Sequence, residues 1–422
     1  MIEEEALTIA ATFATKVRTR KMAYLISQYP AVSHTFIYNE IQELRAAGFE
    51  LYTASINASD RPADRLPECE RAEQRQTFYV KSSGLFELLR SAIYTVIKNT
   101  CGFWSGLLFT VSLGGDLKRF CYFIEALIIG TWMMKKELSH LHVHFGMAAS
   151  TVAMIVAKTF PVTYSLTIHG PEEFYDVGKF YLTKKVDAAS FVCCIGSFAR
   201  SQMMKNSSSD QWHKFVVAPL GVDVDKFRPF PPRFFSVPLS TPVFEILCIG
   251  RLVAAKGQQI LIAAIKILVA EGRPVRLRLV GGGPERPHLE RKIAADNLGD
   301  YVILEGEINQ DQIPGLLRMA DAFALASFAE GIPVALMEAM AMEIPCVSTM
   351  IAGIPELIRD EIDGLLVFPS DADGLADALR RLMDQPELRR RIGQAGRLRV
   401  ISRYNLKKNV RALGEVYSCR LP

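Results

Sequence analysis

The chain of 422 residues is 50% apolar and 22% charged, a composition that excludes a disordered chain, a collagen and a small disulfide scaffold. Its formal net charge of +4 is too close to neutral to indicate nucleic-acid binding. The eight cysteines include no Cys-x-x-Cys pair, and the adjacent Cys193 and Cys194 lie in an apolar run. This pattern argues against a zinc site and a disulfide framework and favours a reducing cytoplasm.

Residues 1–21 begin with acidic side chains and lack a long apolar core, so we interpret them as a leader rather than a secretory signal. Short apolar runs then alternate with helical patterns. The first half is expected to contain a helix at 36–47 and strands at 22–27, 49–54, 142–145, 162–166, 190–194 and 214–217. Such alternation predicts βαβ units and a parallel sheet covered on both faces.

Residues 86–134 are unusually apolar, but no segment has the roughly 20 mostly apolar residues that a membrane span requires. Two interpretations of this region remain open. The helices lie on a membrane surface, or they are buried in the first domain, which is the interpretation we favour.

Residues 227–242 hold five prolines and therefore predict a linker. Alternation resumes after it, with helices expected at 258–270 and 335–342 and strands at 244–250, 275–280, 302–305, 322–325, 346–349 and 364–367. We expect two doubly wound, Rossmann-like α/β domains, residues 22–226 and 244–395, joined by a linker at 227–243 and facing each other across a cleft.

The remaining residues, 396–422, are expected to be helical and to pack back on the first domain. From Arg380 to the end the chain has 12 Lys and Arg against three Asp and Glu. Such a segment suits phosphate, an anionic membrane or simply a solvated helical face, and the sequence leaves these alternatives open.

The strongest motif, residues 327–338, follows the strand expected at 322–325. Gly331 permits a tight turn, and Pro333 suits the first turn of a helix whose amino end would present free N–H groups to an anion. Glu330 and Glu338 would lie about 12 Å apart along an ideal helix, too far to share a proton. They suit two parts of one extended ligand, although a capping and a surface glutamate would look the same.

Two further strand ends carry ligand-binding patterns. Gly250 and Arg251 close one strand, and Lys256 follows where a helix begins, so two cations and a helix amino end suit a diphosphate. Gly282 and Gly283 belong to a glycine turn, residues 281–283, that lacks the Gly-x-Gly-x-x-Gly spacing of dinucleotide enzymes. No Walker A motif is present, which excludes a P-loop ATPase.

Histidines mark the first half. His169, followed by Gly170, ends a strand at the expected cleft and suits a hydrogen bond to a ligand or a proton relay. His142 and His144 alternate on a strand, so both imidazoles point to one side; with Glu137 as the nearest carboxylate, a metal site is disfavoured. The loop containing Ser33, His34 and Thr35 would place hydroxyls at the cleft or at the helix cap.

In combination, these motifs resemble the retaining, group 1 type of glycosyltransferase with the two-domain GT-B fold. Bacterial exopolysaccharide and colanic-acid glycosyltransferases look the most similar. The resemblance covers nearly the whole chain from Met22. Its most specific part runs from Pro219 to Pro369 and comprises residues 219–223 with Phe227, 250–251 with 256–257, 281–284, 330–338 and 352–356.

The resemblance implies a role for each matching residue. Arg251 and Lys256 would hold the diphosphate of a nucleotide-sugar, Glu330 would bind the donor sugar, and Glu338 would bind the ribose. Main-chain groups of Gly331, Ile332, Pro333 and Val334 would meet the sugar and phosphates, with Gly250, Gly282 and Gly283 lining the donor site. His169 would lie beside the transferred sugar, and the Ser33–Thr35 loop would approach donor or acceptor. Relatives often have an aspartate where this chain has Glu172 and Glu173, so neither glutamate receives a role.

The resemblance also implies that no metal or other cofactor is needed, since two cations can stabilise the leaving diphosphate. The acceptor would be a glycan, commonly linked to polyprenyl diphosphate, and the enzyme would be cytoplasmic, on the inner face of the membrane. We expect a hexosyltransferase that retains configuration. The rivals are a nucleotide-sugar epimerase of similar fold and a non-catalytic scaffold of a polysaccharide assembly complex; a dehydrogenase is disfavoured by the missing fingerprint.

Overall fold

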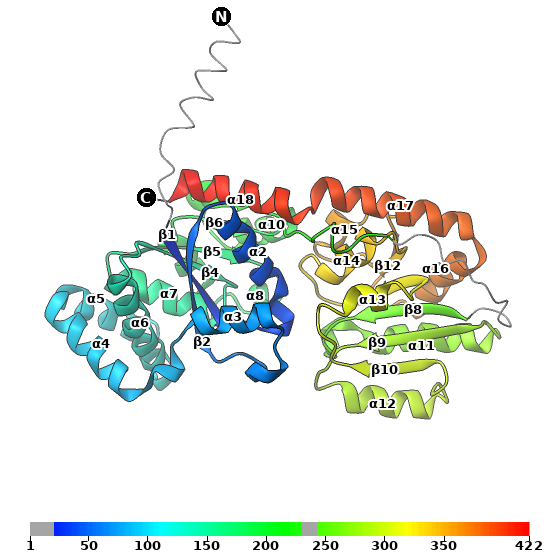
Figure 1. Ribbon diagram of the computed structural model, residues 1–422, viewed down its shortest axis with the longest axis horizontal. Helices are drawn as coiled ribbons and strands as arrows, with labels where there is room; N and C mark the ends of the chain where they lie inside the picture. The colour runs from blue at the N-terminus through cyan, green and yellow to red at the C-terminus, as the bar shows by residue number, and fades with distance from the viewer. Residues whose placement is uncertain (1–20, 230–242, 422) are drawn as a thin grey trace, which may run out of the picture.

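The computed structural model describes residues 21–229 and 243–421, which form two α/β domains side by side (Figure 1). The expected leader, apart from Lys21, and most of the proline-rich linker lie outside the described residues. Lys21 itself opens the first strand.

The first domain contains a seven-stranded parallel sheet in the order β3-β2-β1-β4-β5-β6-β7. Its strands are β1 (Lys21–Gln28), β2 (Glu50–Asn57), β3 (Phe78–Tyr79), β4 (His140–His144), β5 (Thr163–Ile168), β6 (Val192–Cys194) and β7 (Phe215–Val217). Its helices are α2 (Thr35–Ala46), α3 (Glu68–Gln76), α4 (Gly84–Lys98), α5 (Thr100–Ser112), α6 (Leu117–Lys135), α7 (Ala148–Thr159), α8 (Glu172–Tyr175), α9 (Leu182–Ala188) and α10 (Ser197–Lys205). The expected strands are confirmed to within a few residues, but β3 was missed because two residues show no periodicity.

The second domain contains a six-stranded parallel sheet in the order β10-β9-β8-β11-β12-β13. Its strands are β8 (Phe244–Ile249), β9 (Val275–Val280), β10 (Val302–Gly306), β11 (Ala322–Leu325), β12 (Cys346–Thr349) and β13 (Leu365–Val367). The helices from here to the carboxyl end are α11 (Gln258–Ala270), α12 (Arg286–Ala295), α13 (Ile313–Leu317), α14 (Val334–Ala341), α15 (Ile354–Leu357), α16 (Ala372–Asp384), α17 (Pro386–Arg403) and α18 (Leu406–Arg420). Short 3-10 turns occur at η1 (Val32–His34), η2 (Ala63–Arg65), η3 (Lys81–Ser83), η4 (Ser209–Lys214) and η5 (Ala254–Lys256).

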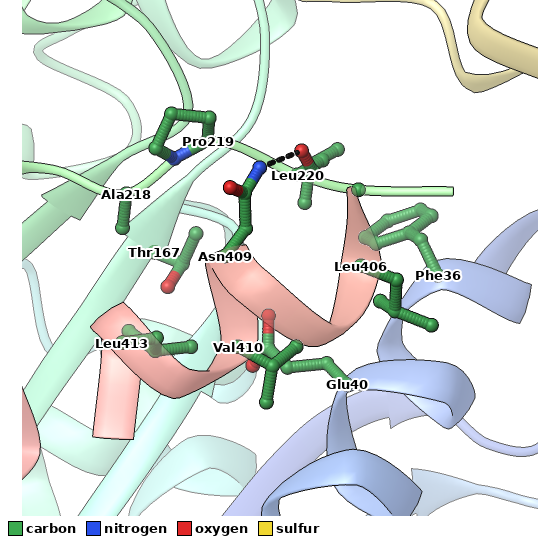
Figure 2. A pocket seen from close by; sticks show the side chains of 11 residues that line it. Phe36, Glu40, Thr167, Ala218, Pro219, Leu220, Leu406, Asn409, Val410 and Leu413 are labelled. Carbon is green, nitrogen blue, oxygen red and sulfur yellow. Dashed lines mark hydrogen bonds between the residues drawn. The ribbon is translucent and has the colours of Figure 1, made fainter. Parts of the chain in front are cut away.

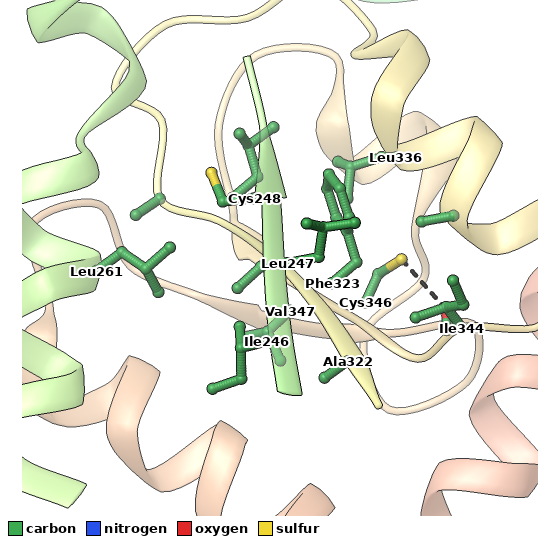
Figure 3. Packing of buried hydrophobic residues seen from close by; sticks show 14 of the residues in the cluster. Ile246, Leu247, Cys248, Leu261, Ala322, Phe323, Leu336, Ile344, Cys346 and Val347 are labelled. Atoms are coloured by element: carbon green, nitrogen blue, oxygen red, sulfur yellow. Dashed lines mark hydrogen bonds between the residues drawn. The ribbon is translucent and has the colours of Figure 1, made fainter. Parts of the chain in front are cut away.

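The central strands β11 and β12 are buried on both faces of the second sheet, as parallel strands covered by helices require. Figure 3 shows their neighbour β8, with Ile246 and Cys248, lying between Leu261 of α11 and Leu336 of α14. All four side chains are at most 2% exposed. Because this sheet is rigidly packed, the loops at the carboxyl ends of its strands are held in defined positions.

The chain crosses between the domains a second time at Tyr404 and Asn405. There it runs beside the first crossing: the Val222 N–H donates to the Tyr404 carbonyl at 2.9 Å, and Leu406 N–H donates to the Val222 carbonyl at 3.1 Å. Helix α18 then lies against α2 of the first domain (Figure 1). The expected boundary at residue 396 is wrong, because it falls inside the continuous helix α17.

Several basic side chains from Arg380 onward have internal partners. Arg380 pairs with Glu271 at 2.6 Å and Arg381 with Glu361 at 2.7 Å. Arg399 donates to the carbonyl of Glu356 at 2.8 Å. These contacts favour a solvated, ion-paired helical face over a phosphate-binding surface.

The apolar region at 86–134 divides between core and surface. Helix α6 is buried over most of its length, including Ile128 and Ile129. Helices α4 and α5 instead expose large apolar side chains, among them Phe86 at 78% and Leu108 at 68%. The prediction that these helices are buried in the first domain is therefore confirmed for α6 and wrong for the outer faces of α4 and α5. None of the helices in the described part of the chain is long and apolar enough to cross a membrane.

Candidate active site

The turn after β5 carries His169 and Gly170 and is held by a buried carboxylate. Glu173 accepts hydrogen bonds from the N–H groups of His169 at 2.7 Å and Gly170 at 2.8 Å, and from Gly146 N–H. Burial raises the pKa of Glu173 to about 7, against the opposing effect of these donors. The sequence analysis left Glu173 without a role; its position four residues after His169, in a Gly-Pro turn, was the available signal.

Gly331 of the second domain meets this turn directly. A β-carbon at Gly331 would lie 1.8 Å from the His169 carbonyl oxygen, and one at Gly353 would lie 2.3 Å from the Gly331 carbonyl oxygen. Only glycine fits such contacts. The strongest sequence motif and the His169 turn are therefore neighbours across the two domains.

Lys256 and Glu330 form an ion pair at the ends of β8 and β11. Lys256 Nζ lies 2.5 Å from Glu330 Oε1, and Ser327 Oγ donates to the same oxygen at 2.6 Å. Both recorded contacts use Oε1. The side chain of Glu330 is 8% exposed and that of Lys256 21%, so water screens the pair only partly.

Arg251 occupies a more open position. Its Nη2 lies 3.7 Å from Glu172 Oε1 of the first domain, and both side chains are more than half exposed, so this pair contributes little to stability. Burial lowers the pKa of His34, and the positive charge of Arg251 adds to that effect. Arg251, Glu172 and His34 thus share one region between the domains, and Glu172 was not among the predicted site residues.

The loop before α2 is held by Asp60, whose carboxylate accepts from Val32 N–H at 2.7 Å. His34 occupies the N-cap position of α2 without a side-chain cap bond, and Thr35 is the first helical residue. The alternative that a hydroxyl caps this helix is therefore wrong for Thr35. The side chain of Ser33 is outside what the structure describes.

The two glycine loops of the second domain lie on each other. A β-carbon at Gly281 would lie 2.1 Å from the Gly250 carbonyl oxygen, and one at Gly283 would lie 2.3 Å from the Leu252 carbonyl oxygen. A β-carbon at Gly282 would meet the Glu307 carboxylate at 2.3 Å, whereas Gly250 has ordinary contacts only. Much of the glycine requirement here comes from main-chain packing between loops.

Glu338 lies in α14, one turn beyond the Pro333 N-cap and Val334, with Ile332 buried just before the helix. It is 5% exposed, and Gln310 Nε2 donates to its Oε1 at 2.5 Å. Burial raises the pKa of Glu338 to about 7, against the lowering effect of Gln310 and Lys226. Gln310 was not among the predicted site residues, because it lies 28 residues before Glu338 in the sequence.

The second half of the chain matches a known protein family. A family profile described as Glycosyl transferases group 1 matches residues 232–399. The chain carries a group 1 glycosyltransferase domain.

Relatives with similar sequences include the colanic acid biosynthesis glycosyltransferase WcaL of Escherichia coli, 28% identical over 85% of this chain and 89% of that protein. The amylovoran biosynthesis glycosyltransferase AmsK of Erwinia amylovora is 33% identical over 52% of this chain and 56% of its own length.

Solved structures establish the GT-B fold of this chain. Sucrose-phosphate synthase from Thermosynechococcus elongatus matches with a TM-score of 0.74 at 19% identity, covering 95% of this chain and 99% of that chain. Anabaena Alr3699/HepE, solved in complex with UDP and glucose, matches with a TM-score of 0.71 at 17% identity, covering 94% and 99%.

The histidines of β4 belong to a buried cluster in the first domain. Within the described ranges, Glu40, His142 and His144 have potential ligand atoms within 4.8 Å of one another. Both ring nitrogens of His142 are engaged, Nδ1 with Ser165 Oγ at 2.7 Å and Nε2 with Thr167 Oγ1 at 2.9 Å. A metal would have to break one of these buried bonds, so we interpret the cluster as a hydrogen-bonded network. The nearby carboxylate is Glu40 of α2, not Glu137 as the sequence suggested.

A small cavity of about 20 Å³ adjoins this network (Figure 2). It lies where α18 meets the first domain and is lined by Glu40, Thr167 and Asn409, whose side-chain amide donates to the Leu220 carbonyl at 2.8 Å. A cavity of this volume accommodates a single water and no sugar nucleotide. We therefore take the region around His169, Arg251 and the Lys256–Glu330 pair, where the two domains meet, as the candidate site.

Proposed function

We propose that the chain transfers a hexose from a nucleotide-sugar to a growing glycan in exopolysaccharide biosynthesis, with retention of configuration. The observation that carries the proposal is the placement of Lys256 and Glu330, 2.5 Å apart, in a group 1 glycosyltransferase domain whose Gly331 touches His169. The names of the colanic acid and amylovoran relatives support the class of product.

The donor diphosphate would bind Arg251 and Lys256. Negative charge grows on the diphosphate as the bond to the sugar breaks, and fixed cations stabilise that charge. These two side chains supply what a metal ion would otherwise supply, so the reaction is proposed to need no metal or other cofactor.

The sugar would bind Oε2 of Glu330, since Oε1 already accepts from Lys256 and Ser327. Glu338 would receive the ribose hydroxyls after Gln310 moves aside. Main-chain groups of residues 331–334 and the loops at Gly250 and Gly282–Gly283 would line the donor site, with His34 and its loop, residues 33–35, toward donor or acceptor.

The acceptor is proposed to be linked to polyprenyl diphosphate at the inner face of a membrane. Helices α4 and α5 support this, because they expose Phe86, Ile97 and Leu108. A cavity of about 450 Å³ beside them is lined by Lys98 and Lys158 together with the apolar Met134 and Phe160. Apolar side chains next to lysines fit the interface of an anionic bilayer.

The proposal is tested with purified protein, EDTA, and UDP-, GDP- and ADP-sugars. One donor should raise the unfolding temperature of the protein and be consumed when a lipid-linked glycan is added, and Lys256→Ala should abolish both effects. The anomeric configuration of the product, read by NMR, tests retention.

The rival functions give different results in the same experiment. Conversion of the donor to another nucleotide-sugar without acceptor would establish the epimerase. Absence of stabilisation by every nucleotide, with and without added acceptor and vesicles, would favour the scaffold. A dependence on added divalent metal would overturn the metal-independent mechanism.

A further inference from the structure

A chain of hydrogen bonds runs from helix α18 into the first domain. The hydroxyls of Tyr417 and Tyr24 are 2.8 Å apart, and Tyr24 donates to Glu40 Oε1 at 2.8 Å. An ionised carboxylate only accepts, so Tyr24 must donate to Glu40 and its oxygen must accept from Tyr417. Burial raises the pKa of both tyrosines well above the usual value, so both keep their protons. The direction of this part of the chain is therefore determined.

The chain continues from Glu40 through His144 to His169. Glu40 Oε1 lies 3.3 Å from His144 Nε2, away from the line of an ideal hydrogen bond, and His144 Nδ1 lies 2.8 Å from His169 Nε2. Burial holds the pKa of His169 well below its usual value, so His169 is neutral and carries one proton. That proton is on Nε2 or on Nδ1, and the two choices give His169 opposite hydrogen-bonding properties.

When His144 carries a single proton, the Glu40 carboxylate favours one of the two arrangements. With a proton on His144 Nε2, that N–H faces Glu40, and His144 Nδ1 accepts from the Nε2–H of His169. In the opposite arrangement, the lone pair of His144 Nε2 would face the carboxylate oxygen at 3.3 Å in a buried site, where electrostatic repulsion is strong.

We propose that Glu40, acting through His144, holds His169 in the tautomer protonated on Nε2, so that His169 Nδ1 is a hydrogen-bond acceptor for a hydroxyl of the bound sugar. The Nδ1 atom is buried and has no hydrogen-bond partner among the residues that the structure describes. Glu40 and His144 are positioning residues here, because they act through His169. The identity of the hydroxyl donor rests on the proposed function, whereas the tautomer itself does not.

The tautomer is measured in the full-length protein without ligand. Histidine is labelled with ¹⁵N, the ring signals of His169 are assigned by their loss in His169→Gln, and their nitrogen shifts show which nitrogen carries the proton. We expect Nε2 protonated and Nδ1 bare. A proton on Nδ1 in the wild type would overturn the proposal, whatever the activity of the protein.

The variant Glu40→Gln then tests whether Glu40 determines the tautomer of His169. Tyr24 and His144 both contact the single atom Oε1 of Glu40, so an amide nitrogen in that position would donate one N–H to the Tyr24 oxygen and the other to His144 Nε2. That arrangement would turn the chain around and move the His169 proton to Nδ1. The matched control is Glu43→Gln, the same change one turn along α2 and outside the chain. An unchanged His169 tautomer in folded Glu40→Gln would refute the role of Glu40; if this variant does not fold, the wild-type spectrum decides.

Activity gives a second readout. Glu40→Gln should lower kcat at least about tenfold, as when the partner that orients a functional histidine is changed, while Glu43→Gln keeps wild-type kcat. Wild-type kcat in a Glu40→Gln protein with the inverted tautomer would overturn the role of Nδ1 as acceptor. If no donor supports transfer by the wild type, the proposed function fails while the tautomer assignment is still decided by the spectrum.

Discussion

The main chain of Gly331 lies against the carbonyl group of His169, so that a β-carbon at position 331 would be 1.8 Å from the carbonyl oxygen. A second interdomain contact lies nearby. Glu356 of the second domain accepts from Ser197 N–H at 2.7 Å and Phe198 N–H at 2.6 Å, and so caps α10 of the first domain. The two domains are therefore joined by specific contacts at the site, besides the two chain crossings.

Gly331→Ala should separate the domains at the site, because its β-carbon cannot occupy the position against His169. We expect transfer to fall by more than about tenfold, with a larger radius of gyration in solution scattering. The matched control is Gly315→Ala in helix α13, where a β-carbon would meet nothing within 4 Å. Wild-type activity in Gly331→Ala would contradict the need for this contact.

Two variants, Lys256→Ala and Glu330→Gln, distinguish the role of the ion pair in stability from its role in donor binding and transfer. Because the pair is partly buried, Lys256→Ala should lower the free energy of unfolding by about 1–3 kcal/mol, as well as abolishing donor binding. Glu330→Gln keeps an acceptor for Ser327, so it should unfold nearly like the wild type while losing transfer. Thermal unfolding and donor titration of both variants check these outcomes, and a folded Lys256→Ala, Glu330→Gln double variant with full activity would end the site assignment.

Glu338 should make stability depend on pH. Its folded-state pKa of about 7 exceeds that of the unfolded chain, near 4.5, so the folded state binds the proton more tightly. The stabilisation that comes from tighter proton binding by Glu338 in the folded state is fully present below pH 4.5 and is lost as the pH rises through 7. Glu338→Gln should therefore gain stability over the wild type as pH rises, by about 2–3 kcal/mol at pH 8 and little at pH 4.5.

Urea unfolding of both proteins across this pH range measures the difference. Nucleotide affinity should nevertheless fall in Glu338→Gln, because ribose hydroxyls lose a charged acceptor. A variant that is less stable than the wild type at pH 8 would refute the buried-carboxylate explanation.

Leu108→Glu should weaken binding to anionic phospholipid vesicles without unfolding the protein, since the side chain is 68% exposed on α5. Vesicle sedimentation and thermal unfolding are the measurements. Leu398→Glu is the matched control, because Leu398 is equally exposed at 68% but lies on α17. Equal loss of vesicle binding in both variants, or no loss in Leu108→Glu, would refute the membrane role of this face.

Much of the donor domain could be predicted from the sequence. Strands β9 and β11 were predicted with the same bounds because both leave a local pattern: β11 is a fully buried apolar run, and β9 alternates buried apolar residues with Arg276 and Arg278. The Gly331–Pro333 turn and the position of Lys256 could also be predicted, because each lies in the loop that follows a predicted strand. No comparison tests the roles assigned to these residues, which stay predictions.

Other features depend on residues that are distant in the chain. Lys256 and Glu330 are separated by 74 residues in the sequence. Glu356 and Ser197, which it caps on α10, are separated by 159 residues, and Tyr417 and Tyr24 by 393. Local periodicity cannot carry such information, because hydrogen bonds of this kind depend on side-chain direction after the domains have packed. The sequence by itself determined the two sheets and the donor-domain motifs; the packing of α18 and the contact between domains decided how Glu40, His144 and His169 are joined.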